Sequence, residues 1–219
     1  MKSPLVAPSL LSADFGNLQR DLEMLNSSSA DWFHVDVMDG IFVPNISFGF
    51  PVLKSIKKFS KKPLDVHLMI AHPENYLERF AEAGAANLTV HIENELDTEA
   101  AVTKIRSLGM KAGIAISPDT EVSALDKIIS NVDMVILMSV RPGFGGQKFI
   151  PSTFQKLSDL KKLMKEKNSA ALIEIDGGVD LDNVRELVMG GADILVAGNT
   201  VFGASDPTGT IAALKSISK

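Results

Sequence analysis

The stretch that decides the fold is WFHVDVMDG at residues 32–40, an apolar and β-branched run that contains two ionisable side chains near its middle. Such a run predicts a buried strand. His34 and Asp36 are two residues apart, so in a strand both side chains point to the same face. An imidazole and a carboxylate on one face suit a divalent first-row metal ion. The stretch therefore predicts a buried strand that carries candidate metal ligands.

The same pattern recurs at two further places. Residues 64–69 form a second apolar run with His67 inside it, and residues 173–178 form a third that ends in Asp176 and two glycines. A single histidine in a strand is most often a satisfied structural residue. However, a lone buried charge costs several kcal/mol, so two histidines and two aspartates at strand ends must pair or coordinate. Together they favour a metal site.

Composition narrows the class of protein. The chain has 219 residues, of which 45% are hydrophobic and 22% charged, as is ordinary for one globular domain. Its net charge of −5 argues against nucleic acid as a partner. It contains no cysteine, which excludes disulfides and thiolate metal sites and fits the cytoplasm. No signal peptide is visible, and no apolar run approaches the roughly 18 to 20 residues of a membrane span.

Strand-like and helix-like segments alternate along the whole chain. The strands lack the apolar–polar alternation of a half-solvated sheet, which is typical of a parallel sheet covered on both faces. This order predicts one α/β domain over residues 1–219, a (β/α)₈ TIM barrel. An open doubly wound sheet is the alternative, but no glycine-rich dinucleotide turn follows the first strand. The expected strands are 5–9, 32–37, 64–69, 88–92, 112–116, 134–140, 172–176 and 194–197, and the expected helices are 17–25, 50–59, 73–83, 98–107, 122–129, 153–166, 181–189 and 207–217.

In such a barrel the active site lies at the carboxyl ends of the strands. Ser9, His34, Asp36, His67 and Asp176 all fall there in the predicted layout. Glycine-rich segments follow the later strands, where barrels of this kind often bind phosphate through backbone N–H groups. Glycine allows the backbone to approach an anion closely. The candidate phosphate-binding residues are Gly143, Phe144, Gly145, Gly146, Gly177, Gly178, Gly198 and Asn199.

Methionines also lie near the C-terminal ends of three expected strands. Met38, Met69 and Met138 are expected to form an apolar lid around a reacting carbon, although methionine in a barrel is more often core filler. His91 ends a further strand, so a position on the same rim stays open.

At these residues the chain closely resembles ribulose-phosphate 3-epimerase, and the resemblance covers essentially the whole sequence. Each motif alone would be a weak signal, but the set is highly specific. The matching segments are APSLLSADF (7–15), HVDVMDGIFVPN (34–45), LDVHLM (64–69), MSV (138–140), PGFGGQKFIP (142–151), EIDGGV (174–179) and VAG (196–198).

The resemblance implies a (β/α)₈ barrel that interconverts D-ribulose 5-phosphate and D-xylulose 5-phosphate in the pentose phosphate pathway. It implies one divalent metal ion per chain, usually zinc, held by His34, Asp36, His67 and Asp176. Asp36 and Asp176 would also be the acid/base pair, and Ser9 and His67 would contact the substrate. A homo-oligomer is implied as well. His and Asp ligands with open positions also accept iron, manganese or cobalt.

The chemistry explains this set of residues. Inverting a carbinol carbon beside a ketone requires one group to remove a proton and another to return a proton to the opposite face. The intermediate is an enediolate, whose charge a metal ion stabilises as a Lewis acid. No hydride moves, so neither a nicotinamide nor a flavin is needed.

The chain departs from the family pattern at three places. Arg141 stands where the family commonly has Asn, Asn199 where Ser is usual, and residues 117–120 read SPDT instead of NPGT. Two other functions stay open at this point. One is the same epimerisation on a ketohexose 6-phosphate such as allulose 6-phosphate, and the other is a non-catalytic phosphosugar-binding barrel.

Overall fold

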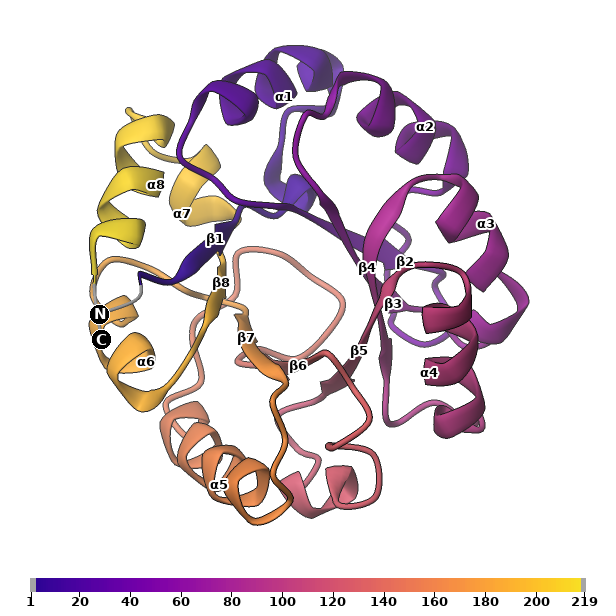
Figure 1. Ribbon diagram of the computed structural model, residues 1–219. Helices are drawn as coiled ribbons and strands as arrows, with labels where there is room; N and C mark the ends of the chain where they lie inside the picture. The colour runs from indigo at the N-terminus through magenta and orange to yellow at the C-terminus, as the bar shows by residue number, and fades with distance from the viewer. Residues whose placement is uncertain (1–2, 218–219) are drawn as a thin grey trace.

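The structure, a computed structural model, describes residues 3–217 and places eight parallel strands inside a ring of helices (Figure 1). Neighbouring strands are hydrogen-bonded in the order β1-β8-β7-β6-β5-β4-β3-β2. The predicted (β/α)₈ barrel is therefore confirmed. The strands are β1 (Leu5–Ala7), β2 (Phe33–Met38), β3 (Leu64–Met69), β4 (Ala85–His91), β5 (Lys111–Ile116), β6 (Met134–Met138), β7 (Leu172–Asp176) and β8 (Ile194–Val196).

The sheet closes between its first and second strands through a few backbone contacts. The N–H of His34 donates to the carbonyl of Pro8 at 3.0 Å, and Ser9 pairs with His34 as an isolated parallel bridge. On the other side β1 pairs directly with β8, with Leu5 opposite Ile194. These contacts nearly close the barrel, which distinguishes this fold from the open doubly wound alternative.

Most helices lie where the sequence pattern predicts them. The α-helices are α1 (Leu18–Ser27), α2 (Phe50–Phe59), α3 (Leu77–Glu82), α4 (Thr98–Ser107), α5 (Thr153–Glu166), α6 (Val184–Gly190), α7 (Asn199–Phe202) and α8 (Pro207–Ser216), and the 3₁₀ helices are η1 (Leu10–Ser12), η2 (Phe15–Asn17), η3 (Pro73–Asn75) and η4 (Val122–Leu125). In the described part of the chain no helix combines the length and apolar character needed to cross a bilayer.

Four predictions about helices need correction. The helix expected at residues 73–83 is divided at Tyr76 into η3 and α3. The helix expected at residues 122–129 is only η4 followed by turns, because bonds of the i to i+3 kind, such as Ile128 N–H to the Leu125 carbonyl, prevail there. The helix expected at 181–189 begins at Val184, since the Asp180 carboxylate accepts the N–H of Asn183 in a local turn. Asn199, expected in a loop, begins the short helix α7.

Strand side chains alternate between two apolar regions. On β2, Phe33 and Val35 join the large core between the sheet and the helices. Inside the barrel, Met134 and Ile136 of β6 pack with Ile194 of β8. The remaining inward positions, on β2, β3, β4 and β7, are largely polar and buried. This polar half of the barrel interior holds the candidate site.

Candidate metal centre and active site

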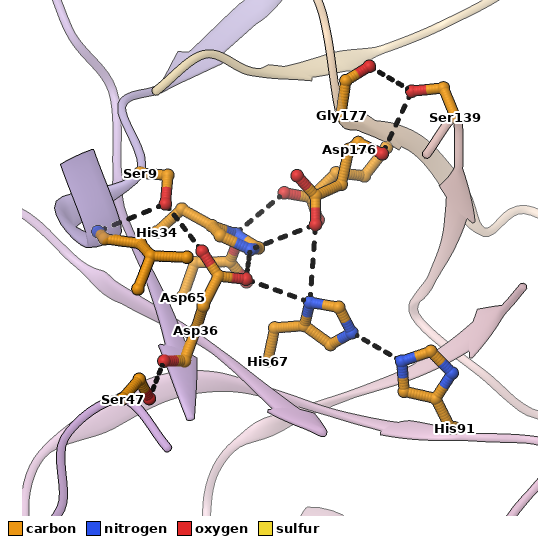
Figure 2. A network of polar contacts seen from close by, with 12 residues as sticks. Ser9, His34, Asp36, Ser47, Asp65, His67, His91, Ser139, Asp176 and Gly177 are labelled. Carbon is orange, nitrogen blue, oxygen red and sulfur yellow. Dashed lines mark hydrogen bonds and ion pairs between the residues drawn. The ribbon is translucent and has the colours of Figure 1, made fainter. Parts of the chain in front are cut away.

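Four side chains from β2, β3 and β7 converge at the carboxyl end of the barrel (Figure 2). His34 Nε2 lies 3.2 Å from Asp36 Oδ1 and 3.8 Å from Asp176 Oδ2. His67 Nδ1 lies 3.3 Å from Asp36 Oδ1 and 3.4 Å from Asp176 Oδ2. Each carboxylate therefore contacts both imidazoles, and one potential ligand atom of each residue lies within 4.8 Å of the other three.

Burial and mutual contact shift the pKa values of these groups. Burial alone would lower the pKa of His67, but its hydrogen bonds to Asp176 and Asp36 outweigh burial and raise the pKa to about 9. Burial lowers the pKa of His34, yet the Asp36 carboxylate raises it well above its ordinary value. For Asp36, burial is likewise outweighed by the two imidazoles, which lower its pKa far below the ordinary range.

The donor set fits a divalent metal ion. Two imidazole nitrogens and two carboxylate oxygens are borderline ligands of the kind that zinc, iron, manganese and cobalt accept. The carboxylates are nearly buried, with exposed fractions of 4% for Asp36 and 9% for Asp176, whereas both histidines are fully buried. Two carboxylates this close together need positive charge between them. The four residues that the sequence predicts as metal ligands are thus brought together as such a site requires.

Serine hydroxyls hold the ends of the strands that carry the carboxylates. Ser9 Oγ donates to Asp36 Oδ2 at 2.5 Å, which leaves Oδ1 facing the imidazoles. Ser47 Oγ donates to the Asp36 carbonyl at 2.7 Å. Ser139 Oγ donates to the carbonyls of Asp176 and Gly177 at 2.9 and 2.5 Å (Figure 2). These contacts fix the backbone directly beneath each carboxylate.

The cluster forms the floor of a cavity of about 330 Å³. Asp36 and Asp176 line it, but the fully buried His34 and His67 do not. A cavity of this size is in the range of small-ligand sites. The other predicted site residues that line it are Ser9, Met38, Met69, Met138, Gly143, Phe144, Gly145, Gly146, Gly177, Gly178, Gly198 and Asn199.

Two glycines after β7 are required by close backbone packing. Gly177 and Gly178 have φ values of 119° and 62°, in the left-handed region. A Cβ atom on Gly178 would lie 2.5 Å from the backbone nitrogen of Phe149, so no other residue fits without moving that loop. Within residues 3–217, the N–H groups of Gly145, Gly146, Gly178 and Gly198 donate to no protein acceptor. The loops thus offer several free backbone donors around one cavity.

The two departures in this region make contacts of their own. Arg141 lines the cavity but is exposed, and its guanidinium contacts the Asp119 carboxylate at 3.1 Å. Asn199 Oδ1 accepts a hydrogen bond from Ser12 Oγ at 2.8 Å, which joins the loop after β8 to the one after β1. Asn45 Nδ2 donates to the Gly143 carbonyl at 2.7 Å and ties the β2 and β6 loops together.

A polar layer that is not predicted from the sequence lies beneath the cluster. His34 Nδ1 lies 2.7 Å from Asp65 Oδ2 and 3.3 Å from Glu174 Oε1, and all three side chains are fully buried. The sequence did contain a signal for this layer. Asp65 precedes His67 by two residues and Glu174 precedes Asp176 by two, so each pair faces the same side of its strand. His91, left open as a rim residue, contacts His67 directly, with 2.9 Å between their Nε2 atoms.

Comparison with known proteins agrees with this geometry. The Ribulose-phosphate 3 epimerase family matches residues 5–202. The chain is 43% identical to ribulose-phosphate 3-epimerase of Mycobacterium leprae, over 97% of this chain and 94% of that one. It is 45% identical to the chloroplastic ribulose-5-phosphate-3-epimerase of Arabidopsis thaliana, over 96% of this chain and 76% of that one.

Solved structures share the fold at low identity. 3-Hexulose-6-phosphate synthase from Salmonella typhimurium superposes with a TM-score of 0.70 at 19% identity, covering 99% of this chain and 98% of that one. KGPDC from Streptococcus mutans gives 0.71 at 14% identity, with 98% and 96% covered. These likenesses concern the barrel alone. The family match and the two sequence relatives go further, and the chain belongs to the ribulose-phosphate 3-epimerase family.

Proposed function

We propose that this protein is a metal-dependent epimerase that interconverts D-ribulose 5-phosphate and D-xylulose 5-phosphate at the third carbon. Family membership supports the reaction. The observation that carries the proposal is the placement of two carboxylates, Asp36 on β2 and Asp176 on β7, at the floor of one cavity with both touching the same two imidazoles. Simple binding of a sugar phosphate does not require a second buried acid.

The two aspartates provide the proton transfers. Asp36, whose pKa its imidazole neighbours lower, starts as an ionised base and removes the proton from the third carbon. The electron pair that bonded this proton moves into the enediolate of the substrate. Asp176 then donates a proton to the opposite face of the same carbon, which inverts its configuration. In the reverse direction the two aspartates exchange roles.

The ligand residues and the methionines support these steps. A divalent ion bound by His34, Asp36, His67 and Asp176 supplies a Lewis acid, which stabilises negative charge that develops on the substrate. We propose zinc first, with iron, manganese or cobalt as alternatives, because the donor set accepts each of them. Met38, Met69 and Met138 line the cavity and exclude water from the reacting carbon. Ser9 lines the cavity, holds Asp36 and contacts the substrate. His67, expected from the resemblance to contact the substrate as well, is fully buried outside the cavity lining and is therefore proposed as a metal ligand only.

The phosphate is proposed to bind in the glycine-rich loops. The free N–H groups of Gly145, Gly146, Gly178 and Gly198 support this assignment, since backbone donors around a cavity suit a phosphate group. Phe144, Gly143, Gly177 and Asn199 complete the proposed binding loops. The nearby Arg141 is paired with Asp119, so its charge is already partly compensated. A cytoplasmic location and a homo-oligomeric assembly stay predictions.

A coupled assay on the purified protein tests the reaction and its competitor together. We expect turnover of D-ribulose 5-phosphate well above that of D-allulose 6-phosphate, loss of activity after chelation, and recovery with one equivalent of a divalent ion. Faster turnover of D-allulose 6-phosphate would show that the protein is a 3-epimerase of the hexulose phosphate instead. Binding of both sugars without turnover of either would make the protein a non-catalytic phosphosugar-binding barrel. Full activity in a demonstrably metal-free sample would overturn the metal assignment.

Gly145 allows a separate test of the phosphate loops. A Cβ atom there would meet nothing closer than 3.8 Å, so Gly145→Val adds bulk beside the free N–H groups without straining the fold. We expect KM for D-ribulose 5-phosphate to rise by about tenfold or more, equivalent to ~1.4 kcal/mol. Gly49→Val is the matched control, because Gly49 lies outside the cavity lining and has no atom within 4 Å of the added Cβ. An unchanged KM in both variants would place the phosphate elsewhere.

A further inference from the structure

We propose that His91 and Glu93 act as positioning residues for His67, forming a relay that directs the Nδ1 lone pair of His67 into the metal centre. The inference rests on the proposed function, because it assigns a role at the metal site described above. Neither residue lines the cavity, so neither is proposed to touch the substrate.

The relay is a chain of three short contacts that leads outward from the cluster. His67 Nδ1 faces Asp36 and Asp176, and its Nε2 lies 2.9 Å from His91 Nε2. Figure 2 shows the His91 ring beyond His67, on the side away from the carboxylates. His91 Nδ1 in turn lies 2.8 Å from Glu93 Oε2. Both histidines are fully buried, whereas the side chain of Glu93 is 24% exposed.

The Glu93 carboxylate determines the direction of both hydrogen bonds in the relay. An ionised carboxylate only accepts, so His91 must donate its Nδ1–H to Glu93. A neutral His91 then has a lone pair at Nε2, and His67 must donate its Nε2–H to it. When His67 is neutral, as metal binding requires, its lone pair is then on Nδ1, the nitrogen that faces the two aspartates. This is the tautomer that can bind a metal ion there.

Glu93 is held in place so that it can perform this role. Its Oε1 accepts the N–H of Ser117 at 2.7 Å and the hydroxyl of Thr120 at 2.5 Å, while Oε2 serves His91. Burial would raise the pKa of Glu93, but the hydrogen bonds from His91, Thr120 and Ser117 outweigh it and lower the pKa to about 2. The carboxylate is therefore ionised in the neutral pH range.

Packing fixes the plane of the middle ring. The His91 and His67 rings meet edge to edge through their Nε2 atoms and are nearly parallel, with ring centroids 5.0 Å apart and an interplanar angle of 25°. Phe42 lies against His91 with ring centroids 4.8 Å apart. Because the His91 ring is held in place, the hydrogen bond that it donates to Glu93 determines which nitrogen of His67 carries a hydrogen.

Glu93→Gln tests the relay because an amide has only one acceptor oxygen. Ser117 N–H and His91 Nδ1–H approach different oxygens of Glu93, so glutamine can satisfy only one of them. If the amide NH₂ faces His91, the relay reverses and the hydrogen of His67 moves to Nδ1. We expect the zinc affinity of the full-length protein, measured by competition with a chromophoric chelator, to fall by about 10- to 100-fold.

Glu74→Gln is the matched control. Glu74 Oε1 contacts His72 Nδ1 at 3.3 Å with the same spacing along the chain, but this pair is exposed and outside the cavity lining. The zinc affinity of the Glu74→Gln protein should equal that of the wild type. The melting temperature of each metal-free variant separates loss of folding from loss of affinity. Nitrogen-15 NMR of the Glu93→Gln protein shows whether its His91 carries hydrogen on Nε2, the reversed state. If it does and the variant still binds zinc like Glu74→Gln and the wild type, the relay is wrong.

Nitrogen-15 NMR of the histidine rings in the zinc-loaded wild type provides a test that requires no variant. We expect hydrogen on Nε2 of His67 and on Nδ1 of His91, with zinc on Nδ1 of His67. Zinc on Nε2 of His67, or hydrogen on Nε2 of His91, would overturn the inference. A wild-type protein that binds no zinc, iron, manganese or cobalt would instead refute the proposed metal site, so the two failures are distinguishable.

Discussion

The barrel interior contains two layers of ionisable side chains that are alike in composition and differ in access to the cavity. β2, β3 and β7 each contribute one residue to each layer, two positions apart. The upper layer is Asp36, His67 and Asp176, and the lower layer is His34, Asp65 and Glu174, with His34 reaching upward to the cluster. Both upper carboxylates line the cavity, whereas every lower side chain is fully buried.

The difference shows that residue type alone does not make a reactive site. In the lower layer, Asp65 lies 2.7 Å from His34 Nδ1 and accepts from Asn87 Nδ2 at 3.3 Å. Burial, together with the charge of Asp65, raises the pKa of Glu174 well above its ordinary value, which favours its neutral form. We infer that Asp65 and Glu174 of the lower layer orient His34. The carboxylates of the upper layer, which are open to the cavity, transfer protons.

The largest effect is expected from removing a base in the upper layer. Asp176→Asn preserves volume but cannot take up or donate the proton, so epimerisation should fall by about 10²–10⁴-fold. The coupled assay should be run with bound metal measured in the same sample, because the carboxylate is also a proposed ligand. A metal-loaded Asp176→Asn protein with wild-type turnover would remove the functional distinction between the layers.

A weaker effect is expected from the lower layer. Asp65→Asn replaces the acceptor that fixes His34 with an amide, so zinc affinity should fall by about 10- to 100-fold while bound substrate still turns over at saturating metal. Asp159→Asn on the exposed face of α5 is the control, since Asp159 contacts only Gln155 and Lys162 among the described residues. If Asp65→Asn abolished turnover even when fully loaded with metal, Asp65 would belong with the catalytic layer.

The pH dependence of metal binding sharpens the comparison further. In the metal-free protein the pKa of His67 is raised to about 9, so its protonated form predominates below that pH. Binding requires the neutral imidazole, and a falling pH therefore weakens zinc binding by about tenfold per unit below pH 9 from this group alone. Calorimetry in buffers of different ionisation enthalpy should detect at least one proton released per zinc at pH 7. Binding without proton release would contradict this assignment.

The smallest effect is expected for Glu174→Gln. Glutamine closely matches the size and polarity of a protonated glutamic acid, and the raised pKa of Glu174 favours that protonated form. Zinc affinity, turnover and melting temperature should therefore change by no more than a few-fold or a few degrees, about 1 kcal/mol. A loss as large as that of Asp65→Asn would contradict the neutral form of Glu174 and would show that its negative charge helps to orient His34.

Sequence pattern predicted much of this arrangement for definite physical reasons. Apolar runs of five or six residues defined β2, β3 and β7, and the family motifs added the ligand set that lies in one cluster. The lower layer was not predicted, because in the sequence Asp65 and Glu174 are isolated charged residues. Only the strand register shows that both lie beside His34. The contact between His67 and His91 depends on side-chain packing between β3 and β4, which period alone does not specify.

The most direct test of the central claim follows the proton at the third carbon of D-ribulose 5-phosphate. The metal-loaded wild-type enzyme is allowed one turnover in D₂O. NMR then measures whether the third carbon of each sugar carries hydrogen or deuterium. Two aspartates acting from opposite faces predict that the first D-xylulose 5-phosphate formed carries deuterium, while the remaining substrate still carries hydrogen. Product that retains the original hydrogen would mean that one group carries the same proton across both faces, and would contradict the assignment of Asp36 and Asp176 as a pair.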